Sequence, residues 1–131
     1  MRVLALDYGS ARCGCAVSDP TGSLATPIDV VERPATRKGI VRLAALIGER
    51  GVERVVVGLP VGLSGADTAQ TAEARAFAAA LARRVAVPVE LYDERFTTAI
   101  AQRRGGAGSE DSRAAAVMLE DWLSAHAGAG R

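Results

Sequence analysis

RVLALDYGSARCGCAVSD, residues 2–19, decides how this chain begins to fold. Arg2–Leu6 is a short apolar run that ends at Asp7, and Cys13–Ser18 is a second such run. The glycine-containing stretch between the two runs has the composition of a tight turn. Two strand-like runs joined by a turn predict a β-hairpin at the start of the protein.

The rest of the sequence alternates between strand-like and helix-like patterns. Apolar spacing, β-branched content and the glycine or proline residues between segments predict three further strands: Pro27–Val31, the buried Val55–Val57, and Val89–Tyr92. The same features predict four helices: Arg37–Arg50 capped by Gly51, Thr68–Arg84, a short helix ending at Arg104, and a final helix at Ser109–Ala125. Three antiparallel strands followed by helical crossovers predict an α/β fold with a mixed five-stranded sheet flanked by helices. This element order also fits more than one α/β fold.

Length and composition limit what else the chain can hold. A chain of 131 residues with 49% apolar side chains suffices for one core, so we expect a single domain over residues 1–131, with residues 127–131 as a disordered tail. The 16 basic and 15 acidic residues nearly cancel, so contact with nucleic acid requires a local patch. Lys38 is the only lysine, and the arginine excess suits phosphate contacts, although a biased genome composition gives the same skew.

The cysteines and the single histidine do not indicate a zinc site. Cys13 and Cys15 lie two apart in a predicted strand, where both side chains point the same way without disulfide geometry. We expect packed thiols in a reducing cytoplasm, and His126 lies in a Gly/Ala-rich tail. No apolar stretch reaches membrane-spanning length and no signal peptide is recognisable, so a cytoplasmic protein without membrane contact is expected.

Three carboxylates are notable because of where the predicted elements place them. Asp7 closes the first strand, Glu94 follows the last strand, and Asp111 lies in the final helix. Asp111 precedes Ala115 by four residues and Trp122 by eleven, so it extends the apolar face of that helix toward the sheet. An inward carboxylate is costly unless a cation or a positive group compensates it. Three such groups predict a Mg²⁺ or Mn²⁺ site, where two ions about 3.5–4 Å apart can activate a water and stabilise the leaving oxygen of a phosphodiester.

Each of these carboxylates also has a purely structural interpretation. Asp7 suits the turn after it, because aspartate bonds its own backbone well. Asp111 suits the positive end of a helix dipole, and Glu94 between Asp93 and Arg95 suits a surface ion-pair cluster. Position alone leaves both interpretations open for all three residues.

Four motifs, in order along the chain, resemble those of the YqgF/RuvX family. Residues 7–19 resemble its D-x-G-x-x-R-x-G-x-A-x-S-D signature, and Gly58–Pro60 with Gly65 resembles its G-L-P loop. Residues 93–98 resemble its D-E-R-[LF]-[ST]-T motif, and residues 111–115 resemble its final D-x-x-A-A helix. Each motif alone is weak, but together they span nearly the whole chain and make the resemblance specific.

The resemblance implies an RNase H-like fold and a hydrolase, namely a nuclease that trims the 5′ end of precursor 16S ribosomal RNA. The same family has also been related, through its similarity to RuvC, to Holliday junction resolution. By motif matching, three residues take the catalytic positions as metal ligands: Asp7, Glu94 and Asp111.

The matching also implies phosphate contacts from guanidinium groups and hydroxyls, which suit phosphate oxygens. These residues are Arg12, Arg95, Thr97 and Thr98. For Arg95, an equal alternative is that it orients the neighbouring Glu94.

The segment between Thr98 and Asp111 departs from the family pattern. Twelve residues intervene, where the family usually carries a longer segment with a basic cluster, and here only Arg103 and Arg104 are basic. Fewer phosphate contacts weaken the grip on a long duplex or a four-way junction. The short segment therefore favours a less extensive RNA site, unless a second copy of the chain supplies the missing charges.

Other functions remain open at this point. A resolvase of four-way DNA junctions acts on two symmetric strands and is expected to be a homodimer, whereas an RNA-trimming enzyme can act as a monomer. A non-catalytic nucleic-acid-binding factor would depend on Arg95 but not on Asp7. Nucleotide binding, as in sugar kinases with a related Asp-x-Gly turn, takes two such domains, and this chain is long enough for one.

Overall fold

The computed structural model describes residues 1–59, 69–93 and 110–126. The short helix predicted to end at Arg104 and the expected tail at residues 127–131 lie outside these ranges. Within them the elements follow in the order β1 (Val3–Asp7), β2 (Arg12–Ser18), β3 (Ala25–Glu32), α1 (Arg37–Glu49), β4 (Arg54–Leu59), α2 (Ala69–Arg84), β5 (Val89–Asp93) and α4 (Glu110–His126). The other predicted strands and helices are therefore confirmed, with ends that differ by two residues or fewer.

The five strands form one mixed sheet in the order β3-β2-β1-β4-β5. β1 pairs antiparallel with β2, and β2 pairs antiparallel with β3, whereas the β1–β4 and β4–β5 pairs are parallel. In the central strand β1, Leu6 lies opposite Cys15 of β2 on one side and Val57 of β4 on the other. The predicted sheet, with three antiparallel strands first, is confirmed.

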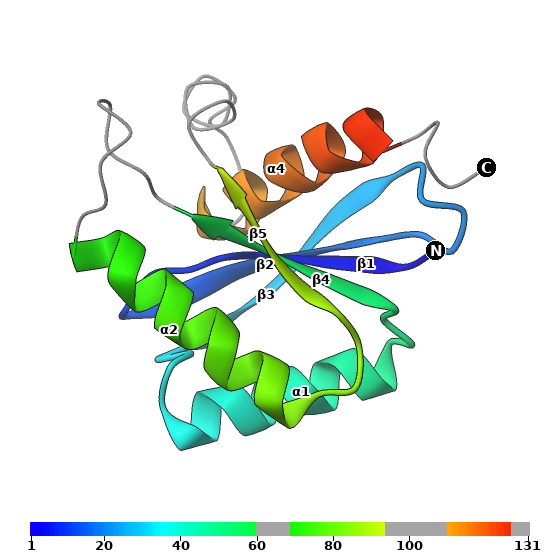
Figure 1. The fold of residues 1–131 in the computed structure, drawn as a ribbon. Helices are drawn as coiled ribbons and strands as arrows, with labels where there is room; N and C mark the ends of the chain where they lie inside the picture. The colour runs from blue at the N-terminus through cyan, green and yellow to red at the C-terminus, as the bar shows by residue number, and fades with distance from the viewer. Residues whose placement is uncertain (60–68, 94–109, 127–131) are drawn as a thin grey trace.

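Helices cover both faces of this sheet. α1 and α2 lie together on one face, and α4 crosses the other (Figure 1). Leu4 and Leu6 of β1 belong to the core formed with α1 and α2, while Val3 and Ala5 belong to the core formed with α4. Because both faces are covered, β1 and β4 are continuous apolar runs rather than alternating ones.

Burial on the helices follows the predicted periodicity. Helical spacing predicts inward side chains on α2 and α4, and the following are buried: Ala74, Phe77, Ala78, Leu81, Ala115, Met118 and Trp122. Val85, predicted on the same face as Leu81, lies just beyond the end of α2 and is only partly buried. Cys13 and Cys15 are buried free thiols on one face of the sheet, as predicted. Gly51 follows α1 with a φ of 63°, a backbone conformation that favours glycine after a helix end. His126 differs from expectation, because it is the last residue of α4 and its ring stacks on Trp122 at a centroid distance of 4.0 Å.

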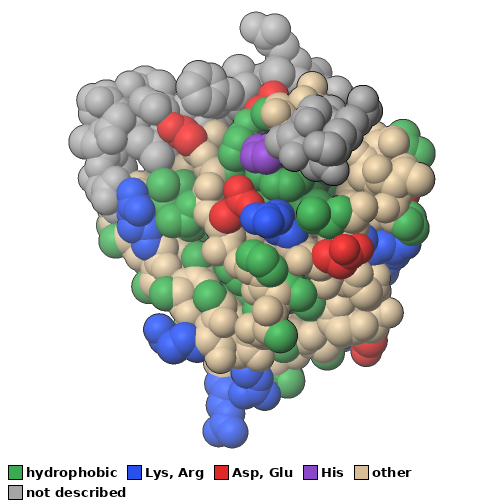
Figure 2. Space-filling model, turned by 45° about the vertical axis from the view of Figure 1, so that its right-hand side comes forward, with side chains coloured by type: hydrophobic (Ala, Val, Ile, Leu, Met, Phe, Trp, Pro, Cys, Tyr) green, Lys and Arg blue, Asp and Glu red, His purple; other side chains and the backbone are tan. Residues whose placement is uncertain are grey.

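The surface shows no single dominant charge on the face drawn in Figure 2, where basic and acidic side chains are interspersed. This distribution agrees with the formal net charge of +1. A polyanion would therefore be held by local groups of basic side chains. In the part of the chain that the structure describes, no helix has the length and apolar character needed to cross a membrane.

Candidate active site

The carboxyl ends of three parallel strands meet at one edge of the sheet. β1 ends at Asp7, β4 at Leu59 and β5 at Asp93, and Leu59 lies opposite Asp93 in the β4–β5 pairing. α2 and α4 both begin beside this edge (Figure 1). We call it the carboxyl edge, defined by Asp7, Leu59 and Asp93. In open α/β sheets, ligands bind in the crevice outside the carboxyl ends of the strands, so a ligand site is expected at this edge.

Asp7 is half-buried at the end of the central strand, where its partner in β2 is Gly14. The next residue, Tyr8, stacks on Phe77 of α2 with ring centroids 4.8 Å apart. Burial raises the pKa of Tyr8, with smaller contributions from the charges of Glu73 and Cys13. Packing of Tyr8 on α2 therefore fixes the backbone immediately after the Asp7 carboxylate.

The turn after Tyr8 is also tightly constrained. A Cβ atom at Gly9 would lie 2.7 Å from the carbonyl oxygen of Arg12, closer than real Cβ contacts. Only glycine allows the backbone at residue 9 to come this close to Arg12. The tight turn lets β2 begin at Arg12, five residues after β1 ends at Asp7. The exposed Arg12 lies opposite Glu32, the last residue of β3.

Ser112 ties the first turn of α4 to the sheet beside Asp7. Its side chain is 2% exposed, and its hydroxyl donates a hydrogen bond to the Ile28 carbonyl at 2.7 Å. The Ser112 hydroxyl oxygen in turn accepts a hydrogen bond from the backbone N–H of Cys15 at 3.3 Å. The β2–β3 register shifts between Cys13 and Cys15, so the hydroxyl bridges the two strands where their ladder is irregular.

This bridge has a consequence for Asp111, which immediately precedes Ser112. Cys15 follows Gly14, and Gly14 is the direct partner of Asp7. The backbone of Asp111 is therefore held close to the strand end that carries Asp7. Sequence reasoning missed Ser112, although it lies three and seven residues before the buried Ala115 and Leu119, on the same helical face.

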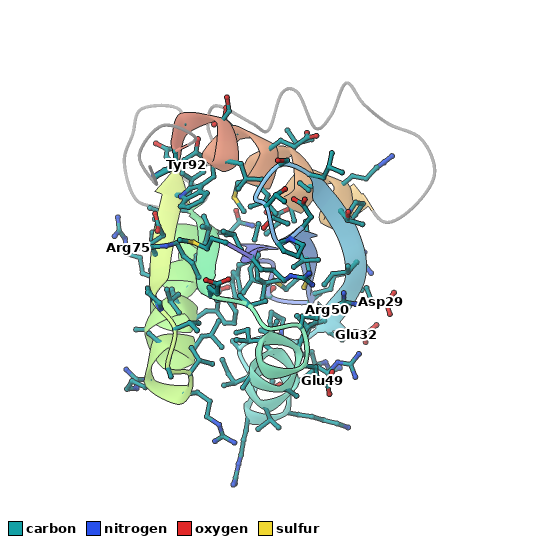
Figure 3. The ribbon with its side chains drawn as sticks, turned by 90° about the vertical axis from the view of Figure 1, so that its right-hand side faces the viewer. Asp29, Glu32, Glu49, Arg50, Arg75 and Tyr92 are labelled. Carbon is teal, nitrogen blue, oxygen red and sulfur yellow. The ribbon has the colours of Figure 1, made fainter. Side chains whose placement is uncertain are left out.

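The far end of α4 is tied to β5 and β4. The indole N–H of Trp122 donates to Glu90 Oε2 at 3.1 Å, and Glu90 Oε1 pairs with Arg54 at 2.6 Å. The Tyr92 hydroxyl donates to the Asp121 carboxylate, and Figure 3 shows Tyr92 on the strand at the far edge of the sheet from β3, next to α4. Anchors near both ends hold α4 in one orientation over the sheet.

We expect Tyr92 to make stability fall at high pH. Burial, followed by the hydrogen bond and negative charge of Asp121 and the charge of Asp93, raises the pKa of Tyr92 from 10.0 to about 12. Between these values the folded state holds a proton that the unfolded chain has lost. The stabilisation is therefore complete below pH 10 and is lost as the pH rises toward 12.

The measurement is urea unfolding from pH 9 to about pH 12, comparing wild type with Tyr92→Phe. The difference in unfolding free energy between the two proteins should shrink as the pH rises through this window. Equal pH slopes for the two proteins would contradict the assignment.

The predicted site residues fall into two groups. Asp7 and Arg12 are described and lie on adjacent strands of the sheet, and the backbone of Asp111 lies in the first turn of α4. Four others lie outside the described residues: Glu94, Arg95, Thr97 and Thr98. Glu94 directly follows Asp93, which ends β5 at the carboxyl edge.

The described side chains do not by themselves form a metal site. Among them, no group of three His, Cys, Asp or Glu residues could hold an ion. Two of the three predicted ligands, Glu94 and Asp111, are not among those side chains. Asp7 offers the hard oxygen donor that Mg²⁺ and Mn²⁺ prefer, so the described donor fits the predicted ions.

Comparison with known proteins supports the fold and the family. Residues 1–125 match the family model described as "RuvX: Holliday junction resolvase". A relative from Mycobacterium leprae is 47% identical over 93% of this chain and 72% of its own length. Another from Maridesulfovibrio salexigens is 38% identical over 95% of this chain and 98% of its own length. Both are named as pre-16S rRNA nucleases.

Solved structures with the same fold are more distant in sequence. Thermus thermophilus RuvC, solved with a Holliday junction substrate, has a TM-score of 0.62 at 19% identity and covers 98% of this chain and 97% of its own. The fowlpox virus Holliday junction resolvase has a TM-score of 0.58 at 11% identity, covering 95% of this chain and 99% of its own. With the strand order, these structures confirm the RNase H-like fold. Because the family model covers nearly the whole sequence and close relatives match at up to 47% identity, this chain belongs to the RuvX family.

Proposed function

We propose that this protein is a divalent-metal-dependent nuclease that hydrolyses phosphodiester bonds, most specifically at the 5′ end of precursor 16S rRNA. Family membership confirms the class of enzyme predicted from the sequence. The observation that carries the proposal is the Ser112 bridge, which holds the residue after Asp111 against β2 and β3 beside the Asp7 strand end. Glu94 follows the last residue of β5 at the same carboxyl edge.

In this proposal Asp7, Glu94 and Asp111 hold Mg²⁺ or Mn²⁺, with two ions as the working arrangement. Bound metal would supply an activated water and stabilise the negative charge that develops on the scissile phosphate. The protein's part is to hold its carboxylates at fixed positions. Packing of Tyr8 on Phe77 limits movement of Asp7, so little reorganisation is needed when substrate binds.

The basic and hydroxyl residues of the motifs would position the substrate. Arg12 is exposed and lies on β2, the strand next to Asp7, so its guanidinium can reach a phosphate beside the one being cut. Arg95, Thr97 and Thr98 follow Glu94 along the chain and are proposed to contact the same backbone. These contacts would fix the register of the strand without reading its sequence.

Precursor 16S rRNA is the proposed substrate because relatives that match over most of both chains carry that name. We propose a single domain over residues 1–131 that acts in the cytoplasm, where buried free thiols such as Cys13 and Cys15 remain reduced. The second candidate is cleavage of four-way DNA junctions, which the description of the family model favours. That activity calls for a dimer, whereas RNA trimming can be carried out by a monomer.

The test is cleavage of a labelled precursor 16S fragment and a four-way DNA junction, each with and without Mg²⁺ or Mn²⁺. Metal-dependent cutting of the RNA alone is the expected result. Cutting of the junction at paired positions, by a protein that sediments as a dimer, would instead support the resolvase. If neither substrate is cut but both are bound, the protein is a binding factor and the proposal is wrong.

A further inference from the structure

A groove of about 610 Å³ lies between the end of β3 and the start of α1. Its lining includes three cationic side chains, Arg33, Lys38 and Arg42, and one acidic side chain, Glu32. The three cationic residues are exposed to solvent. We call this the β3–α1 groove. Although the whole chain is nearly neutral, this site concentrates positive charge in a concave surface, where the field acting on an anion is strongest.

The walls of the groove are held by backbone packing. Arg33 has a φ of 45°, and its N–H donates to the Ala11 carbonyl at 2.9 Å. A Cβ at Gly39 would lie 2.3 Å from the Arg33 carbonyl oxygen, so the loop and the first turn of α1 touch directly. The Thr36 hydroxyl donates to the same carbonyl at 2.7 Å and accepts from the Gly39 N–H at 3.1 Å. The basic side chains therefore project from a fixed frame, which lowers the entropy cost of binding.

The groove begins at the same end of the sheet as Asp7 of the carboxyl edge. Glu32 lies opposite Arg12 at the start of β2, and Asp7 lies one strand further along. Figure 3 shows Glu32 on β3, at the opposite edge of the sheet from Tyr92. Neighbouring strands are about 5 Å apart, so the groove begins about 10 Å from the Asp7 strand. Arg12 lies between them and links the groove to the proposed cutting site.

We propose that the β3–α1 groove binds the phosphate backbone of the nucleic-acid strand that flanks the cut. This inference rests on the proposed nuclease function and adds to it a second point of contact. Its chemistry suits a polyanion, because the lining has three cationic side chains and one carboxylate. Contacts with phosphates do not depend on the base sequence. The segment between Thr98 and Asp111 has only two basic residues, Arg103 and Arg104, and the groove adds three more positive charges.

The test is binding of a labelled single-stranded oligonucleotide, measured by fluorescence anisotropy at several salt concentrations in EDTA, so that nothing is cut. The variant is Lys38→Glu with Arg42→Glu, two exposed positions on α1. We expect the variant to weaken binding by at least about tenfold at low salt. The slope of log Kd against log salt should fall by about 1.4, because each single-strand phosphate contact contributes about 0.7.

The matched control is Arg83→Glu with Arg84→Glu, which makes the same change in net charge at the C-terminal end of α2. This control should bind nearly as well as wild type. Equal losses in both variants would show a general charge effect, and an unchanged Kd for the groove variant would show that the groove is not used. Either result overturns the inference, provided that circular dichroism confirms that both variants are folded.

A cleavage assay separates this inference from the proposed function. A dinucleotide has a single phosphodiester, the one that is cut, so it offers no flanking phosphate to the groove. The groove variant should therefore cut a dinucleotide at the wild-type rate while cutting a long strand more slowly. If wild type cuts nothing but binds in a groove-dependent way, the nuclease proposal fails and the groove stands. If wild type cuts and the groove variant binds normally, the nuclease proposal is supported and the inference about the groove is wrong.

Discussion

Asp7→Asn is expected to abolish metal-dependent cleavage while leaving the fold intact. The amide has the size of the carboxylate but lacks its charge, so it binds a hard divalent cation much more weakly. Metal stabilisation of a phosphoryl transition state is worth several kcal/mol, and each 1.36 kcal/mol is a factor of ten in rate. We therefore expect a loss of at least about a thousandfold in the single-turnover rate.

The measurement compares wild type and Asp7→Asn on the labelled precursor 16S fragment across a range of Mn²⁺ and Mg²⁺ concentrations. Asp29→Asn is the matched control, because Asp29 is an exposed carboxylate on the edge strand β3, seen away from Tyr92 in Figure 3. The control should cut at the wild-type rate. If Asp7→Asn still cuts at a rate within about tenfold of wild type, Asp7 is not a metal ligand.

The same substitution separates a nuclease from a binding factor. A factor that only binds nucleic acid should keep its affinity and its cellular role when Asp7 loses its charge. Retained binding with lost cleavage is the result expected of a metal ligand. An unfolded variant would show instead that Asp7 serves the turn, and circular dichroism distinguishes this outcome.

Ser112→Ala is expected to cost both stability and activity. The substitution leaves the Cys15 N–H and the Ile28 carbonyl without their hydroxyl partner at a buried position. An unsatisfied buried polar group costs about 1–3 kcal/mol, so the free energy of unfolding should fall by about that amount. The first turn of α4 also loses its attachment to β2 and β3, and a shift of about 1 Å at a catalytic group can cost about a hundredfold in rate.

Urea unfolding and the metal dependence of cleavage together test this role. Ser124→Ala is the control, because Ser124 lies on the same helix but is exposed. If Ser112 positions Asp111, the alanine variant should need a higher metal concentration for half-maximal rate, which a purely structural residue would not change. Ser112→Thr keeps the hydroxyl and should recover part of the metal affinity. Loss of stability with an unchanged metal requirement would refute the positioning role.

Much of the fold could be predicted because the spacing of apolar residues along the chain reflects which side chains are buried. The run Val55–Val57 is apolar at every position because both faces of β4 are covered, and all three residues are 0% exposed. Phe77 and Leu81 recur at helical spacing because one face of α2 packs on the sheet. The strand ends were less predictable: β3 was expected at residues 27–31 and extends over Ala25–Glu32, because pairing with β2 continues to Ser18 at one end and Arg12 at the other.

The candidate site was predicted through motifs more than through geometry. Asp7 could be placed at a strand end because an apolar run stops there. That the start of α4 lies beside Asp7 could not be derived, because the Ser112–Ile28 contact joins residues 84 positions apart. No local pattern encodes a hydrogen bond between such distant residues. The β3–α1 groove was missed for the same reason, since its charges come from two elements and the loop between them.

Patterns along the chain were enough to predict the strands and helices of the described residues, their buried faces, and the family to which the motifs belong. These features depend on residues that are close together in the sequence. The tertiary structure decided the strand order β3-β2-β1-β4-β5 and the attachment of α4 through Ser112. It also brought the basic side chains of the β3–α1 groove together from α1 and the loop before it. The strand order and the attachment of α4 depend on contacts between residues far apart in the sequence, whose free energy is gained only when the whole sheet has formed.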